Sequence, residues 1–198
     1  EKIRESAQTN RNNLSNEIAD LFEKGGRLRY VLPSLGLLYL YGSVNEDQKA
    51  LQSGLYGLES LVITCGLTYT IKMLCQRRQP GDGGFGVWGG PGLSTDDAHL
   101  SFPSGHSAIA FSTAGMIAAV YGEDNWLVAA LAYGIAGLTA WSRVNDDQHW
   151  VSDVFFGSAI GYFTAKAVAG RRLNQGQNWP LLPSWSGDGV TINYIRRF

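Results

Sequence analysis

This chain contains little histidine, little cysteine and almost no net charge. Its 198 residues include three histidines and two cysteines, and its formal net charge is −1 at pH 7. A charge so close to zero excludes the broad basic field that a nucleic-acid-binding surface requires. The whole chain, 1–198, has the length of one ordinary domain that can bury a core.

The two cysteines support neither a disulfide nor a metal site. Cys65 and Cys75 fall in one stretch that we expect to be helical, where their spacing corresponds to about 15 Å along the axis. That separation is too long for a disulfide, and no further cysteine or histidine stands at metal-ligand spacing. We therefore expect free thiols, no bound metal, and no information on the redox compartment.

Long apolar runs are also scarce, and the mean hydropathy is only −0.09. A membrane-spanning helix needs about 20 apolar residues. Most stretches without Asp, Glu, Lys or Arg are shorter: Tyr30–Asn45, Ser60–Ile71, Asn125–Ser142 and Val154–Ala165. The longer stretch Ala98–Gly122 contains a polar Pro-Ser-Gly-His motif. We expect a soluble or peripheral protein with possible membrane contact in preference to an integral membrane protein, and short spans in a thin or distorted bilayer stay open as the alternative.

The spacing of apolar residues predicts an all-α fold, a bundle of about six helices. The first is an amphipathic helix over 1–24, which Gly25-Gly26 should end. Further helices are expected over 30–42, 46–77, 107–121, 125–142 and 149–170. Seven glycines make 81–101 a loop. The tail 171–198 contains prolines and a Ser-Gly-Asp-Gly turn, which predicts an extended arm or a short hairpin.

Two of the three histidines lie in motifs that carry chemistry. In the second motif, Ser142-Arg143 is followed by five residues, His149, three residues and Asp153. If His149 and Asp153 share a helix, the carboxylate lies beside the imidazole and can hold one ring nitrogen as N–H. The other nitrogen is then a nucleophile or a base. The planar fork of Arg143 suits two phosphate oxygens.

The first motif is Pro103-Ser104-Gly105-His106, which stands where an apolar helix should begin. Ser104 is a candidate N-cap. The N-terminus of a helix attracts anions, and Gly105 allows a ligand to approach the backbone closely. His106 would face the anion and protonate a leaving oxygen. Each motif alone is more typical of an ordinary cap or polar pair, but their combination in this order favours a catalytic site.

These residues resemble the signature of the type 2 phosphatidic acid phosphatase superfamily, which includes lipid phosphate phosphatases, bacterial class A acid phosphatases and vanadium haloperoxidases. The resemblance covers about residues 50–170. It implies that His149 attacks phosphorus, that Asp153 orients His149, and that His106 protonates the leaving group. It also implies a phosphate-binding role for four residues: Lys72, Ser104, Gly105 and Arg143.

One position departs from the family. After Lys72 and six further residues the family has Arg-Pro, whereas this chain has Gln79-Pro80. Glutamine has an amide NH2 and no charge, and a lost charged contact to phosphate costs on the order of 1.5–3 kcal/mol. The neighbouring Arg77 and Arg78 are candidates to substitute. The alternatives are a weakened site, a site specialised for another substrate, or an engineered change.

The resemblance implies a single metal-independent phosphomonoesterase domain that works through a phosphohistidine, with a lipid or prenyl phosphate as the favoured substrate. Three alternatives stay open: a nonspecific soluble acid phosphatase, a vanadium-dependent haloperoxidase, and a weakened phosphate-binding protein. No cofactor is expected, and vanadate would be an inhibitor, or the cofactor of a haloperoxidase. The oligomeric state is not predicted.

Such substrates favour a location in the cell envelope, periplasmic or membrane-associated. No signal peptide is visible at Glu1, but a chain that begins Glu-Lys-Ile-Arg is typical of a trimmed form, so a missing leader does not argue for the cytoplasm. The Gly-rich loop 81–101 joins two phosphate-binding motifs and should border the pocket mouth. It is either a flexible connector or a lid that contacts an apolar substrate tail.

Overall fold

The structure of the chain is a computed structural model that describes residues 2–83, 86–173, 182–186 and 189–193. Within these ranges there are seven α-helices: α1 (Lys2–Thr9), α2 (Asn13–Phe22), α3 (Leu28–Val44), α4 (Gln48–Cys75), α5 (Gly105–Tyr121), α6 (Trp126–Asn145) and α7 (Val151–Arg172). Three 3-10 turns connect them: η1 (Glu23–Gly26), η2 (Pro80–Asp82) and η3 (Asp97–His99). Two strands, β1 (Leu182–Ser186) and β2 (Gly189–Asn193), pair antiparallel. The prediction of an all-α bundle with a C-terminal hairpin is confirmed.

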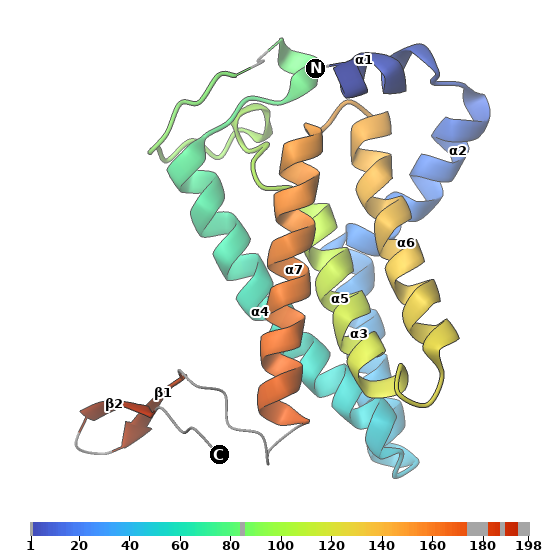
Figure 1. The fold of residues 1–198 in the computed structure, drawn as a ribbon, viewed down its shortest axis with the longest axis vertical. Coiled ribbons are helices and arrows are strands. Elements are labelled where there is room, and N and C mark those ends of the chain that lie inside the picture. Colours follow the sequence, from blue (N-terminus) through green and yellow to red (C-terminus); the bar gives the residue numbers. More distant parts are fainter. Residues whose placement is uncertain (1, 84–85, 174–181, 187–188, 194–198) are drawn as a thin grey trace, which may run out of the picture.

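Helix α5 lies at the centre of the bundle and contacts α3, α4, α6 and α7 (Figure 1). The small side chains of this sequence allow close packing between α5 and α7. A Cβ carbon on Gly157 would overlap the carbonyl oxygen of Ser104, and one on Gly161 would overlap that of Ala108. Glycine is therefore required at both positions if α7 is to pack against the start of α5.

The apolar core is divided into three clusters around α5. Buried residues of α5 and α7 form one cluster: Met116, Val120, Val168 and Ala169. A second joins α3 to α4 (Val31, Leu35 and Leu61), and a third joins α5 to α6 (Ala110, Ala114 and Ala136). These clusters fix the helices around α5, so the ends of α4, α5, α6 and α7 that carry the sequence motifs meet at one end of the bundle (Figure 1).

The predicted single helix over 1–24 is wrong, because α1 and α2 are separate helices. Asn12 caps α2 in a capping box: its side chain accepts from the Ser15 amide at 2.9 Å, and the Ser15 hydroxyl accepts from the Asn12 amide. An N-cap residue has extended backbone and cannot continue a preceding helix. The apolar spacing that predicted the helix belongs to α2, and η1 follows it directly.

His149 also lies outside the helix in which the sequence analysis placed it. The N-cap of α7 is Trp150, and the Asp153 carboxylate accepts from the Trp150 amide at 3.0 Å. Asp153 therefore occupies the first turn of α7, where its charge complements the helix dipole. His149 precedes the cap, and its amide bonds back to the carbonyl oxygen of Arg143 at 3.2 Å.

Large apolar side chains cover much of the outer surface of the bundle. Examples that are more than half exposed come from α3, α4, α6 and α7: Leu37, Val62, Leu131, Phe155 and Phe163. Although the runs without a charged residue are short, α4 continues through Glu59 in its middle and α6 through Arg143 near its end. Both are long and apolar enough to cross a membrane by length and composition, though a core helix can pass the same test.

Glu59, on the apolar helix α4, is a structural carboxylate: it accepts two hydrogen bonds from Arg172 of α7, at 2.8 and 3.0 Å. Cys65 and Cys75 are free thiols.

Candidate active site

Asp153 is the fully buried centre of a polar cluster. One carboxylate oxygen, Oδ2, accepts from the Ser101 hydroxyl and from the Trp150 amide, and the other, Oδ1, accepts from the Arg77 guanidinium. Burial opposes the charged carboxylate, but the neighbouring His149 ring, the hydrogen bond from Ser101 and the charge of Arg77 outweigh it and lower the pKa of Asp153. Asp153 is therefore an anion with a complete set of donors.

His149 lies beside this anion. Its Nδ1 atom is 3.8 Å from Asp153 Oδ2 and 3.5 Å from the Ser101 hydroxyl oxygen. Among the described residues no partner is recorded for the other ring nitrogen, Nε2. Burial lowers the pKa of His149, so the ring is neutral at neutral pH. A neutral imidazole with Nδ1–H directed at a carboxylate carries its lone pair on Nε2, as a nucleophile requires.

The Pro-Ser-Gly-His motif forms the start of α5, as predicted. Ser104 is the N-cap, and its hydroxyl accepts from the Ser107 amide at 3.4 Å. The Ser104 amide donates to the backbone oxygen of Asp153 at 2.9 Å, which ties the first motif to the second. Lys72 of α4 donates to the carbonyl oxygen of Leu100 and lies next to Gly105. These contacts bring Lys72, Ser104, Gly105 and Asp153 together.

His106 follows Gly105 at the start of α5. Its Nε2 atom is buried and has no hydrogen-bond partner among the described residues. Burial, and then the charge of Arg143, lower the pKa of His106 to about 3, so the ring is neutral without a bound anion. A bound phosphate dianion would supply the opposite charge and a hydrogen-bond acceptor, both of which favour the protonated ring.

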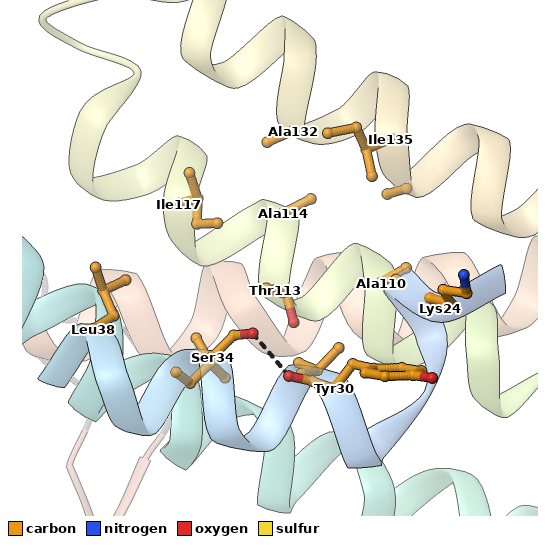
Figure 2. Close-up of a pocket in the computed structure, with 14 residues that line it drawn as sticks. Lys24, Tyr30, Ser34, Leu38, Ala110, Thr113, Ala114, Ile117, Ala132 and Ile135 are labelled. Atoms are coloured by element: carbon orange, nitrogen blue, oxygen red, sulfur yellow. Dashed lines mark hydrogen bonds between the residues drawn. The ribbon is translucent and has the colours of Figure 1, made fainter. Parts of the chain in front are cut away.

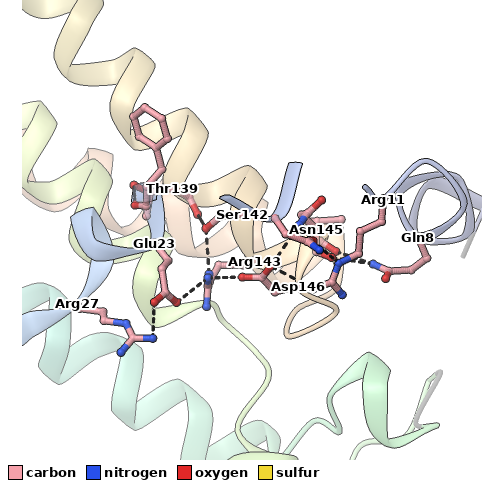
Figure 3. A network of polar contacts seen from close by, with 12 residues as sticks. Gln8, Arg11, Glu23, Arg27, Thr139, Ser142, Arg143, Asn145 and Asp146 are labelled. Atoms are coloured by element: carbon pink, nitrogen blue, oxygen red, sulfur yellow. Dashed lines mark hydrogen bonds and ion pairs between the residues drawn. The ribbon is translucent and has the colours of Figure 1, made fainter. Parts of the chain in front are cut away.

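Arg143, in the last turn of α6, is held by two carboxylates (Figure 3). Its Nη2 atom donates to Glu23 at 2.9 Å and to Asp146 at 2.6 Å, while Nε donates to the Ser142 hydroxyl at 3.1 Å. Glu23 comes from η1 and also pairs with Arg27. Arg143 is thus buried and fixed in orientation, and no partner of its Nη1 is recorded among the described residues.

The N-terminal segment, which comprises α1, α2 and η1 (residues 2–26), therefore forms one wall of the site. Besides the Glu23 contact, the carbonyl oxygen of Phe22 accepts from the Thr139 hydroxyl of α6 at 2.7 Å. Gly26 packs directly on the backbone of His106. No local sequence signal identifies Glu23, because its partner Arg143 is far away in the chain and the contact depends on how η1 packs against α5 and α6.

Two of the residues predicted to bind phosphate contact the Gly-rich loop. The side-chain amide of Gln79 donates to the carbonyl oxygen of Asp97 at 2.9 Å. The backbone amide of Gln79 donates to the carbonyl oxygen of Ala98 at 2.9 Å. Arg78 is exposed, with its Nε atom 3.4 Å from His99 Nε2. The buried arginine is the neighbouring Arg77, which binds Asp153. The contacts of Gln79 and Arg78 join the Gly-rich loop to the end of α4.

An apolar cavity of about 470 Å³ begins beside the N-terminal segment (Figure 2). Its floor is α5, and its walls are α3 and α6, with Lys24 and Gly25 of η1 at one end. Ala110, one helical turn after His106, lines the same cavity. Because Gly26 contacts His106 and Gly25 lines the cavity, one end of the cavity lies next to the candidate site.

Sequence comparison identifies the family. The sequence profile of the PAP2 superfamily matches residues 53–176, more than half of the chain. The chain belongs to the PAP2 superfamily. The matched segment contains both motifs and Lys72, so the resemblance inferred from these residues is confirmed. The PAP2 segment does not include α1, α2 or η1. Glu23 and Gly26, which contact the site, both belong to η1.

Known PAP2 proteins agree with this assignment. A lipid A 1-phosphatase of Porphyromonas gingivalis is 39% identical over 61 residues, which cover 31% of this chain but only 14% of that protein. The transmembrane PAP2-type phosphatidylglycerolphosphate phosphatase of Bacillus subtilis has a TM-score of 0.72 at 24% identity, over 87% of this chain and 84% of that chain. For LpxE of Aquifex aeolicus the TM-score is 0.65 at 19% identity, with coverage of 84% and 92%. At these identities the two structures establish the shared fold.

Proposed function

We propose that this PAP2 protein is a phosphatase that hydrolyses a lipid phosphate monoester through a phosphohistidine at His149. The observation that carries the proposal is the arrangement of His149, whose Nδ1 faces the buried Asp153 carboxylate at 3.8 Å while no partner is recorded for Nε2 among the described residues. The similar proteins from Porphyromonas and Bacillus are named as a lipid A 1-phosphatase and a phosphatidylglycerolphosphate phosphatase, and these names support the same reaction class.

In the first step, His149 Nε2 attacks phosphorus and the bond from phosphorus to the leaving oxygen breaks. His106 gives its proton to that oxygen, so the product leaves as a neutral alcohol. Asp153 stabilises the positive charge that develops on the His149 ring. Lys72, Arg143 and the N-terminus of α5 at Ser104 and Gly105 bind the non-bridging oxygens.

In the second step, water attacks the phosphohistidine. His106, now neutral, accepts a proton from this water, and the bond between phosphorus and His149 Nε2 breaks. Inorganic phosphate leaves, and both histidines return to their starting protonation states. The residues named need no metal ion in either step, so we propose a metal-independent reaction.

The lipid part of the proposal rests on two apolar features. The cavity between α3, α5 and α6 has the volume of a ligand pocket and an almost wholly apolar lining. Since it begins next to the candidate site, an acyl or prenyl chain attached to the phosphate would lie in it, with Lys24 near the headgroup (Figure 2).

The second feature is the exposed apolar surface of α3, α4, α6 and α7. Large apolar side chains exposed on several helices are typical of membrane or protein contacts. Because the charged active-site residues lie at one end of the bundle and the apolar side chains lie along its length, we propose that the protein acts at a membrane of the cell envelope. The membrane would then also hold the substrate's chains.

The experiment is phosphate release from p-nitrophenyl phosphate and from phosphatidic acid in detergent micelles with EDTA present. The parent chain should turn over both, with the lipid preferred, and His149→Ala should lower the rate by at least about 10³-fold. Mass spectrometry of rapidly quenched protein should show a phosphoryl group on His149 in the parent.

Each alternative predicts a different result, either in this assay or in a separate measurement on the same protein. Equal turnover of the two esters would indicate a nonspecific acid phosphatase. Bromide oxidation that depends on vanadate would indicate a haloperoxidase. Tight phosphate binding without turnover would indicate a binding protein, and turnover that EDTA abolishes would contradict the metal-independent reaction.

A further inference from the structure

Arg77 is buried at the junction of the Gly-rich loop and α7, and it is not one of the defined positions of the sequence motifs. It follows Gln76, whose left-handed backbone (φ 45°) ends α4 and turns the chain. The Arg77 residue is 8% exposed, whereas the next residue, Arg78, points to solvent. A buried guanidinium requires partners of opposite charge or aromatic faces.

Arg77 has both kinds of partner. Its Nη1 atom donates to Asp153 Oδ1 and, at 2.7 Å, to the hydroxyl oxygen of Ser152. The guanidinium carbon lies 4.8 Å from the ring centre of Trp88 and 5.4 Å from that of Trp150. One tryptophan belongs to the Gly-rich loop and the other caps α7. The two rings therefore hold the guanidinium in one orientation and exclude water from its pair with Asp153.

The backbone of Arg77 binds the other polar neighbour of His149. The Ser101 amide donates to the carbonyl oxygen of Arg77 at 3.0 Å, and the Ser101 hydroxyl donates to Asp153 Oδ2. Ser101 and Asp153 are the two groups that approach His149 Nδ1, at 3.5 and 3.8 Å. Arg77 thus contacts both groups that set the position of the His149 ring and has no recorded contact with the ring itself.

We propose that Arg77 is the positioning residue of this site: it fixes Asp153 and Ser101 against His149 Nδ1 and offsets the charge of Asp153. This proposal rests on the proposed function for the roles of His149 and Asp153. The offset has a chemical consequence. Without Arg77, the uncompensated Asp153 carboxylate would stabilise the imidazolium form of His149, so that more of the ring is protonated and unable to attack.

The test compares Arg77→Met and Arg77→Lys with Arg172→Met. Methionine keeps an aliphatic side chain beside the two tryptophan rings but removes the positive charge. Lysine keeps the charge but loses the planar guanidinium and its paired N–H donors. Arg172 is a matched control, because it also pairs with a carboxylate and joins α7 to α4 at the other end of α7. All three variants are first checked for folding by thermal unfolding in detergent.

For turnover of p-nitrophenyl phosphate, Arg77→Met should lower kcat by at least about tenfold with KM changed less than about threefold. Arg77→Lys should recover part of kcat, and Arg172→Met should keep both values. The acid limb of the kcat/KM profile should move to higher pH in Arg77→Met alone. An unchanged limb together with a kcat within about threefold of the parent would overturn the proposal.

Nuclear magnetic resonance separates this proposal from the proposed function. The chain has three histidines, so the ¹⁵N signals of the His149 ring can be assigned by comparison with His149→Ala. The charged groups around this ring are Asp153 of α7, Lys72 of α4 and His106 of α5. The pKa of His149 should be higher in Arg77→Met than in the parent, whether or not the chain hydrolyses phosphate. An equal pKa in both proteins would overturn the role of Arg77, while a parent without turnover would contradict only the phosphatase assignment.

Discussion

Gly26 and His106 are in direct backbone contact, although they lie on different elements. A Cβ carbon at Gly26 would come within 2.6 Å of the His106 carbonyl oxygen and within 2.7 Å of its Cα and Cβ atoms. Real Cβ atoms do not approach other heavy atoms so closely, so any side chain at residue 26 must displace His106 or the N-terminal segment.

We therefore expect Gly26→Ala to reduce catalysis through His106. A displacement of the proton donor by about 1 Å costs on the order of 10²-fold in rate. The measurement is kcat for p-nitrophenyl phosphate. Gly36→Ala in α3 is the control, because no atom lies within 4 Å of its added Cβ. It should leave kcat unchanged and stabilise the helix by about 0.5–1 kcal/mol. A fully active Gly26→Ala protein would show that η1 moves away and leaves His106 in place, and would contradict the expected displacement of His106.

Glu23 should weaken anion binding, because its carboxylate lies 2.9 Å from the guanidinium that we assign to the phosphate. Although burial raises its pKa, the Arg27 hydrogen bond and the charges of Arg143 and Arg27 lower the pKa below its usual value. Glu23 is therefore an anion at neutral pH. Removing its charge while keeping its shape should increase the attraction between Arg143 and phosphate.

Glu23→Gln should accordingly lower the inhibition constant of inorganic phosphate by about three- to tenfold at low ionic strength, and by less in high salt. Glu17→Gln, at an exposed position of α2, controls for the change in net charge. If phosphate binds more weakly to Glu23→Gln than to the parent, the main role of Glu23 is to orient Arg143.

The cavity in Figure 2 should determine chain length. Ala114 lies on its floor, so Ala114→Leu should lower kcat/KM for a long-chain phosphatidic acid by about tenfold or more, since each methylene that leaves an apolar site costs about 0.8 kcal/mol. Turnover of p-nitrophenyl phosphate should not change. Ala130→Leu makes the same substitution at an exposed position of α6 and should have no effect on either substrate. Equal losses on both substrates would exclude a chain in this cavity.

The two histidines should respond differently to pH and to phosphate. Burial lowers the pKa of His149, so the neutral nucleophile persists below pH 6.5 and is lost only as the pH falls through the lowered pKa. The acid limb of kcat/KM should therefore lie below pH 6.5. His106, with a pKa of about 3, should be neutral at pH 6 without ligand and become protonated when phosphate or vanadate binds. Ring ¹⁵N shifts measure both, and a His106 signal that phosphate does not move would contradict its role as the acid.

The sequence predicted most helices because apolar spacing and glycine or proline punctuation are local properties. α3 to α7 lie close to their expected ranges, but the expected first helix is two helices. The Asn12 cap that separates them was present as an Asn-x-x-Ser pattern. The position of His149 was missed because Asp153 binds the Trp150 amide, and this bond starts α7 one residue after Trp150.

Candidate-site residues that lie in short sequence motifs could be predicted from the sequence. Residues that join the site through contacts between distant segments could not. His106, His149 and Asp153 are recognisable from their spacing alone. The roles of Glu23 and Arg77 depend on tertiary geometry: the first on how η1 packs, the second on the left-handed residue that turns Arg77 inward and Arg78 outward. Adjacent arginines are indistinguishable in sequence until such a turn is known.

The contacts between the ends of α5 and α7 also set when the protein can become active. The Ser104 amide binds the Asp153 backbone, and Gly157 packs against Ser104. Among the helices that the structure describes, α7 is the last in chain order, so Lys72, the anion-binding turn and His106 are all made before His149 and Asp153. A nascent chain that stops before α7 lacks Asp153, so the proposed nucleophile His149 has no carboxylate beside it until α7 has been added.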